Sequence, residues 1–454
     1  MTRETNENQK TAVSNQQPGL RRSLKLWHLV VYGIIIIQPT APMGIYGVVS
    51  NLARGHVTTT IFIAMIAMLL TAISYGRMAR VYPTAGSAFT YVSKELNPQV
   101  GYMVGWAMLM DYILNPIICV IWCSQAARNI VPGVPFAFWA IGFAGLSTYL
   151  NTRGIQTSSR VNAFMSIAMS LVVLLFLGEG VRYILSVVHP SAGDLLRPIY
   201  DRSTFSTSVV LRGTSVAALT YIGFDGISTM AEEVENPRRN ILLATVFTCL
   251  IIGLLSMAEV YVAQLVWPAT KPFPANIVDT AFVHVAARVG GVFLFHLLNS
   301  TLLVANFGSA MAAQFGASRL MYSMGQENSL PRRVFGTVDR RHHVPRNNVF
   351  ITGAIALLGA FLLTYEKGAE LLNFGAFIAF IGVNTAALVH YKFRPQERVV
   401  FPVLIPALGI LVCGFIWIHL SRSAQVLGSL WICVGLIVAW AMRKSKTIRI
   451  ATQQ

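Results

Sequence analysis

The chain has 454 residues, of which 54% are hydrophobic and only 12% are charged, and its mean hydropathy is +0.58. This balance excludes a soluble globular protein of this length and predicts an all-α polytopic membrane protein. The net charge of +17 does not indicate nucleic-acid binding, because the basic residues are spread between apolar segments instead of gathering with aromatics on one face.

Charge-poor runs divide the chain into twelve predicted transmembrane helices. Their ranges are 28–50, 57–76, 98–124, 133–151, 161–182, 208–231, 241–267, 282–312, 347–365, 370–391, 400–420 and 424–442. Residues 1–25 are polar and lack the apolar region of a signal peptide, so we expect a disordered cytosolic tail there and a second cytosolic tail over 443–454. The segments on one side hold 25 of the 35 Lys and Arg residues, and the positive-inside rule therefore places both termini in the cytoplasm, across the inner membrane.

The first predicted span is interrupted at its centre by Gln38-Pro39-Thr40-Ala41-Pro42-Met43-Gly44. Proline removes a backbone donor and glycine relaxes the backbone, so a break here leaves N–H and C=O groups unpaired at membrane depth. Lipid cannot satisfy these groups, and protein, water or a ligand must do so. The alternative is a proline-kinked helix that neighbouring helices repair.

The third span carries Asp111 well inside its apolar run, with Asn115 one turn later. A carboxylate at membrane depth is costly unless it is paired or hydrated, so Asp111 is a candidate for binding substrate or protons. The alternative is a structural aspartate that is bonded to a neighbouring helix.

The sixth span repeats the features of the first, because Gly223 and Gly226 bracket Phe224 and Asp225. Broken helices at matching places in two halves are typical of transporters built from inverted repeats. The two breaks lie five spans apart, and an odd number of spans inverts the second copy. We therefore predict repeats over 26–186 and 208–391, followed by two additional helices over 400–442.

Glu259 in the seventh span is a further candidate for proton handling, unless it lies near the helix end. The sequence shows no catalytic motif, and its histidines and cysteines form no metal set. We accordingly expect no enzyme activity, no metal and no cofactor, and a proton or sodium gradient as the driving force.

The sixth span and its exit contain Thr220-Tyr221-Ile222-Gly223-Phe224-Asp225, Glu232-Glu233 and Asn236-Pro237-Arg238. These residues resemble the sixth-helix signature of the amino acid–polyamine–organocation (APC) transporters. Further stretches are similar to the putrescine-importer branch of that family, namely residues 82–92, 97–106, 111–112, 318–325 and 372–376. The resemblance implies the leucine-transporter-type fold of five plus five inverted spans with helices 1 and 6 broken. It also implies secondary active transport of an amine-bearing solute. The substrate contacts would come from Gln38, Pro42, Met43, Gly44, Asp111, Tyr221, Phe224, Asp225 and Gly226.

Gly44 departs from the putrescine-importer pattern, which reads Gln-Pro-Met-Thr-x-Phe-Asp-x-Phe-Gly and has an aspartate at this position. A dication requires two separated acids, so the glycine favours a monoamine or a zwitterionic amino acid. Backbone N–H groups near Met43 and Gly44 would hold the carboxylate of such an amino acid.

We thus expect a proton-coupled importer of an organic amine or amino acid, with Asp111, Asp225 and Glu259 as the candidate proton-handling groups. Its partners would be the small solute and the lipid bilayer, without nucleic acid or an obligate protein partner. The alternatives are a putrescine or polyamine importer proper, a carrier of an uncharged or anionic solute on the same scaffold, and a sensor or membrane enzyme. The last of these would predict an added soluble domain or a catalytic set.

Overall fold

The computed structural model describes residues 24–83, 87–154, 159–231, 233–268, 271–326, 330–339, 341–342, 344–394 and 399–451. Residues 1–23 of the predicted tail, residues 84–86 and Glu232 of the quoted motifs lie outside this description. The described residues are helical apart from connecting turns and an isolated parallel bridge between Leu24 and Val234.

Helices lie over each of the predicted spans, although several of them run past the predicted ends. In chain order they are α2 (Leu26–Ile37), α3 (Ala41–Leu52), α4 (Val57–Val81), α5 (Ser87–Glu95), α6 (Pro98–Ile130), α7 (Phe136–Thr152), α8 (Ser159–Tyr183), η1 (Ile184–Val188), α9 (Ala192–Leu196), α10 (Thr207–Ala217), η2 (Ala218–Tyr221), η3 (Phe224–Met230), α11 (Pro237–Val266), η4 (Val278–Thr280), α12 (Ala281–Gln326), α13 (Arg332–Phe335), α14 (Arg346–Leu362), α15 (Tyr365–Phe393), α16 (Leu404–Ile418) and α17 (Arg422–Ala451). The last helix continues through most of the segment that was expected to be a C-terminal tail.

The predicted break in the first span is confirmed. Helices α2 and α3 meet at an angle of 46° across a short gap. Gln38 ends α2 with a positive φ of 73°, and Pro42 lies in the first turn of α3, where a missing N–H costs no helical hydrogen bond. The chain therefore changes direction in the middle of this apolar segment.

The sixth span is broken as well. Helix α10 gives way to the short helical turns η2 and η3, and Gly223 between them has a φ of 117°. A Cβ atom at Gly223 would lie 2.7 Å from the Cγ2 atom of Ile36 in α2. Glycine is thus required both by the backbone conformation and by the close approach of the two broken segments.

The chain is a multi-pass membrane protein. By length and composition, the described residues contain seven helices able to cross a membrane, or eight if the bent pair α2–α3 is counted as one span. The apolar helices α14 and α16, with 17 and 15 residues, are shorter than this criterion requires. The twelve-span arrangement therefore remains a prediction.

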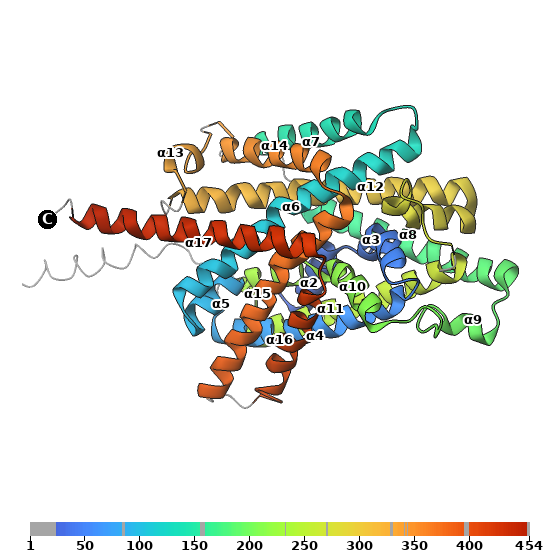
Figure 1. Ribbon diagram of the computed structural model, residues 1–454, viewed down its shortest axis with the longest axis horizontal. Coiled ribbons are helices and arrows are strands. Elements are labelled where there is room, and N and C mark those ends of the chain that lie inside the picture. The colour runs from blue at the N-terminus through green and yellow to red at the C-terminus, as the bar shows by residue number, and fades with distance from the viewer. Residues whose placement is uncertain are drawn as a thin grey trace, which may run out of the picture.

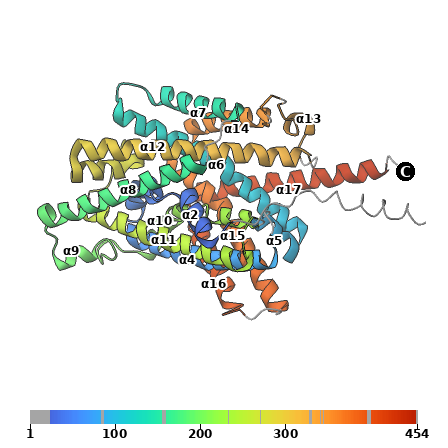
Figure 2. The same cartoon turned by 180° about the vertical axis from the view of Figure 1, so that it is seen from behind.

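The broken segments lie in the interior of the bundle. Figure 1 shows the long helices α6, α12 and α17 running along the molecule, with α7 and α14 on one side and α4 and α16 on the other. Figure 2 shows the same order from behind, with α2 and α10 at the centre. In α3, every residue from Pro42 to Ser50 is buried, so the first break is enclosed by protein.

Candidate functional site

The first break is anchored to α12 through Gln38. Its Nε2 atom donates a hydrogen bond to the carbonyl oxygen of Ala305, with a distance of 3.3 Å. This bond satisfies a carbonyl of the neighbouring helix and fixes the point where α2 ends. Gln38 therefore holds the break in place, and its role toward a substrate remains a prediction.

Gly44 lies on the wall of α3 that faces α6 and α15. A Cβ atom on Gly44 would be 3.4 Å from the hydroxyl of Tyr365 and 3.8 Å from the indole nitrogen of Trp122. Pro42 and Met43, in the same turn, are buried. The position that carries an acid in the putrescine-importer pattern thus faces two polar groups, a hydroxyl and an indole N–H.

Trp122 is fully buried, and its indole N–H has no hydrogen-bond acceptor among the described residues. An unmade hydrogen bond of a buried donor costs about 1–3 kcal/mol, so this N–H is available to a ligand acceptor. The sequence reasoning did not single out Trp122 or Tyr365. For Trp122 a signal existed, because it follows Asp111 by about three helical turns and so lies on the same face of α6.

Asp111 is half-buried in the middle of α6. Among the described residues, no Lys, Arg or His forms an ion pair with the Asp111 carboxylate. One turn later, the Oδ1 atom of Asn115 accepts hydrogen bonds from Ser309 of α12 and from Cys119, both at 3.3 Å. Asn115 thus joins α6 to α12, whereas the carboxyl group of Asp111 has no ion-pair partner among the described residues.

Asp225 differs from Asp111 because its carboxylate accepts hydrogen bonds from backbone N–H groups of the second break. The donors are Gly223, Gly226 and Asp225 itself. The two aspartates are close enough to repel each other. Two half-buried carboxylates therefore meet at the breaks, and one of them already has backbone partners.

Tyr221 and Phe224 fix the sixth segment to its neighbours. The hydroxyl of Tyr221 donates to the carbonyl oxygen of Ile61 in α4, with a distance of 3.0 Å. The ring of Phe224 lies 5.4 Å from the rings of Tyr75 and Phe380. Both predicted site residues are fully buried, so in this conformation they form the wall behind the break.

Gly226 completes the packing of this segment against the first one. A Cβ atom at Gly226 would lie 3.2 Å from the Cδ1 atom of Ile36, which also contacts the second break at Gly223. The two broken segments are therefore in direct contact along α2 and η3.

Glu259 lies elsewhere, in the second half of α11. It is fully buried, and neither carboxylate oxygen has a hydrogen-bond partner among the described residues. The hydroxyl of Ser256, one turn earlier, also lacks a partner there. Glu259 belongs to α11, whereas Asp111 belongs to α6 and Asp225 to η3. The structure thus groups most predicted site residues at the breaks and places Glu259 on a different helix.

Sequence comparison with known proteins finds similarity over almost the whole chain. A family profile described as "Amino acid permease" matches residues 28–449. The chain is 32% identical to the low-affinity putrescine importer PlaP of Escherichia coli, over 94% of each chain. It is 25% identical to the branched-chain amino acid permease BcaP and 24% identical to a methylthioribose transporter, both of Bacillus subtilis and both over 94% of each chain.

These matches confirm the resemblance on which the sequence interpretation relied. The profile and the relatives describe transporters and not enzymes, in agreement with the missing catalytic motifs. Because the profile runs from the first broken span to the last helix, the chain belongs to the amino acid permease family of the APC superfamily.

Proposed function

We propose that the protein is a secondary active transporter that imports an organic amine or amino acid across the cytoplasmic membrane, coupled to protons. In this proposal twelve spans form two inverted repeats of five, followed by two additional helices, and both termini are cytoplasmic. The observation that carries the proposal is the proximity of Asp111 on α6 to Asp225 at the second break, with no Lys, Arg or His side chain paired to Asp111 among the described residues.

A cationic amine would neutralise the repulsion between these two acids. Since the backbone of the second break already satisfies Asp225, the ammonium group would bind Asp111 and the free carbonyl groups of the breaks. To drive import, a proton must cross inward together with the substrate, so the coupled proton would be held by a carboxyl group other than the one that binds the ammonium. Asp225 and Glu259 are the candidates when Asp111 binds the substrate, and Asp111 is the candidate when it does not.

A carboxylate on the substrate would find donors on the opposite wall. The indole N–H of Trp122 has no acceptor among the described residues, and the start of α3 places backbone N–H groups near Met43 and Gly44. The Met43 N–H donates to the Thr40 carbonyl at 3.1 Å, so it would exchange this partner for the substrate. Helix N-termini favour anions, and Gly44 leaves no side chain between them and the substrate. This arrangement favours a zwitterionic amino acid over a diamine.

The two broken segments are joined at one end and would move as one unit. The N–H of Leu24 donates to the carbonyl of Glu233 at 3.1 Å, and the N–H of Glu235 donates to the carbonyl of Leu24 at 2.9 Å. This pairing links the entry of α2 to the exit of η3. Rocking of this unit against α6 and α12 would give alternating access.

Two other substrates have specific support. The similarity to PlaP favours putrescine or another polyamine, with a second group replacing the absent aspartate. The methylthioribose transporter among the relatives and the glycine at position 44 favour an uncharged solute on the same scaffold, and an anionic solute is the related alternative.

Uptake by the purified protein in liposomes tests the proposal. Asp111→Asn keeps the side-chain shape and removes the charge, so we expect it to abolish uptake of amines and amino acids while leaving the fold intact. Asp194→Asn is the matched control, because Asp194 lies in the exposed helix α9. Uptake by Asp111→Asn at the unmodified rate would contradict the proposal, and competition by unlabelled putrescine, amino acids and neutral solutes would identify the substrate class.

A further inference from the structure

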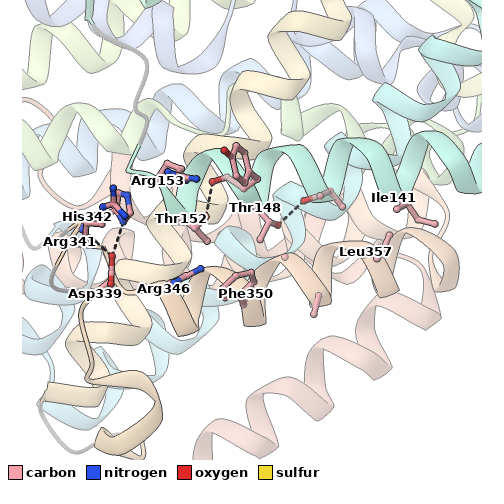
Figure 3. A pocket seen from close by; sticks show the side chains of 15 residues that line it. Ile141, Thr148, Thr152, Arg153, Asp339, Arg341, His342, Arg346, Phe350 and Leu357 are labelled. Carbon is pink, nitrogen blue, oxygen red and sulfur yellow. Dashed lines mark hydrogen bonds and ion pairs between the residues drawn. The ribbon is translucent and has the colours of Figure 1, made fainter.

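A cleft between α7 and α14 lies outside the proposed transport site. Its volume is about 590 Å³. On α7 it is lined by residues three or four positions apart, which form one face of that helix, and the facing wall comes from α14. Figure 3 shows that its two ends differ in chemistry.

One end of the cleft is apolar and exposed at the surface of the bundle. Ile141 and Leu357 line this end, and 56% of the Ile141 surface is exposed. Gly145 follows on α7, where a Cβ atom would meet no other atom within 4 Å. The missing side chain deepens the cleft at a place where nothing else fills it.

The other end is basic. Arg153, Arg341 and Arg346 line it, and all three are exposed. The guanidinium group of Arg153 lies 5.2 Å from the centre of the Tyr149 ring, and that of Arg346 lies 5.5 Å from the centre of the Phe350 ring. These rings hold two of the guanidinium groups at the end of the cleft without neutralising their charge.

The acid at this end, Asp339, already has a partner. It accepts hydrogen bonds from the backbone N–H of His342 at 3.0 Å and from its Nδ1 atom at 2.8 Å. The bonds from His342 lower the pKa of Asp339. Within the described residues, none of the three arginines forms an ion pair with a carboxylate. The basic end therefore has unneutralised positive charge.

We propose that this cleft binds an anionic phospholipid, with the phosphate at Arg153, Arg341 and Arg346 and an acyl chain along Ile141, Gly145 and Leu357. Guanidinium groups bind phosphate through two parallel hydrogen bonds, and basic pockets between transmembrane helices are suited to anionic head groups. A soluble anion would leave the apolar wall unused, and a neutral lipid would leave the arginines unpaired. The lipid would connect α7 to α14 and so stabilise this side of the bundle.

Thermal unfolding of the full-length protein in detergent tests the proposal. Phosphatidylglycerol should raise the unfolding midpoint in a saturable manner, because a ligand that binds the folded state stabilises it. Phosphatidylcholine and inorganic phosphate should raise it much less at equal concentration. Equal protection by phosphatidylcholine would overturn the charge recognition, and equal protection by inorganic phosphate would show a site for a soluble anion instead.

Two variants locate the site. Arg153→Gln with Arg346→Gln should weaken phosphatidylglycerol binding about tenfold or more for each charge removed. The control pair Arg238→Gln with Arg239→Gln removes the same charge from exposed positions at the start of α11 and should leave the binding unchanged. If both double variants lost phosphatidylglycerol affinity equally, binding would depend on the overall charge of the protein. That result would refute the cleft as the binding site.

A variant of the apolar end keeps the proposal testable if the arginine variant does not fold. Gly145→Trp fills the cleft and leaves every charge in place, so it should reduce the phosphatidylglycerol retained by the purified protein, as counted by native mass spectrometry. Gly178→Trp on α8 is the control, because that glycine also has open space around it. Unchanged retention in Gly145→Trp would overturn the placement of the acyl chain.

Discussion

Replacing Gly44 with aspartate should change the selectivity of the transporter from an amino acid toward a diamine. The new Cβ atom would lie 3.4 Å from the hydroxyl of Tyr365 and 3.8 Å from the indole nitrogen of Trp122, which are ordinary contact distances. The backbone of α3 is helical at this position and accepts an aspartate. The carboxylate would then have two neighbouring donors, which offset part of the cost of burying it.

The size of the effect follows from the charges. Two unit charges about 4 Å apart interact by about 4 kcal/mol at an effective dielectric constant of about 20. The added carboxylate would attract the second ammonium of a diamine and repel the carboxylate of an amino acid. If desolvation cancels half of this difference, roughly 2 kcal/mol remains, which is about a thirtyfold change in relative affinity.

Competition for uptake in proteoliposomes measures this change directly. The concentrations of putrescine and of an amino acid that halve the uptake are compared among the unmodified protein, Gly44→Asp and Gly44→Asn. Asparagine has the same shape without the charge, so it should not produce the shift. An equal shift in both variants, or a folded Gly44→Asp protein with unchanged selectivity, would refute the electrostatic reasoning.

Three further substitutions test other parts of the structure. Gly223→Ala should reduce stability by about 1–3 kcal/mol, because alanine is strained at a φ of 117°, and the thermal unfolding midpoint would record the loss. Glu259→Gln should retain substrate exchange but lose accumulation driven by a proton gradient, if this buried carboxyl carries the coupled proton; unchanged accumulation would exclude that role. Glu95→Gln should reduce the free energy of unfolding by about 1–3 kcal/mol and so lower the unfolding midpoint. The reason is that the Glu95 carboxylate accepts hydrogen bonds from Tyr82 at 2.6 Å and from His390 at 2.7 Å.

Matched substitutions separate these effects from general disturbance. Gly178→Ala in α8 is the control for Gly223, because its Cβ atom would meet no neighbour and alanine favours a helix. Glu179→Gln is the control for Glu95, since its partner Arg182 is 72% exposed and exposed ion pairs contribute little. A loss of stability in the controls as large as in the variants would contradict the assigned contacts.

The broken spans could be predicted from the sequence because proline and glycine act locally. Pro39, Pro42 and the glycines around Asp225 limit the backbone whatever surrounds them, and the structure places both breaks where these residues lie. The helix ends were less predictable. Helix α12 continues to Gln326, beyond the predicted end at residue 312, because an apolar run does not mark where a helix leaves the membrane.

The candidate site was predicted only in part, because an acid at membrane depth does not reveal its partners in the sequence. Asp111 and Asp225 were both visible as costly charges, but only the fold shows that Asp225 has backbone donors. The vacant indole N–H of Trp122 depends on how α6 packs against α3 and α15. A tryptophan in a span is ordinary in a sequence, and its missing acceptor is a property of three helices together.

The distribution of satisfied and unsatisfied polar groups separates the residues that build the site from those available to a substrate. Gln38, Tyr221 and Asp225 already have hydrogen-bond partners. Replacing them should therefore first destabilise the backbone conformation at the two breaks. Among the described residues, Asp111 forms no ion pair and the indole N–H of Trp122 has no acceptor, although each group is costly to leave alone in a membrane protein. One is an acid and the other a donor, and both lie on one face of α6. A substrate with an ammonium group and a carboxylate would satisfy both, which is why an amino acid fits this arrangement better than a diamine.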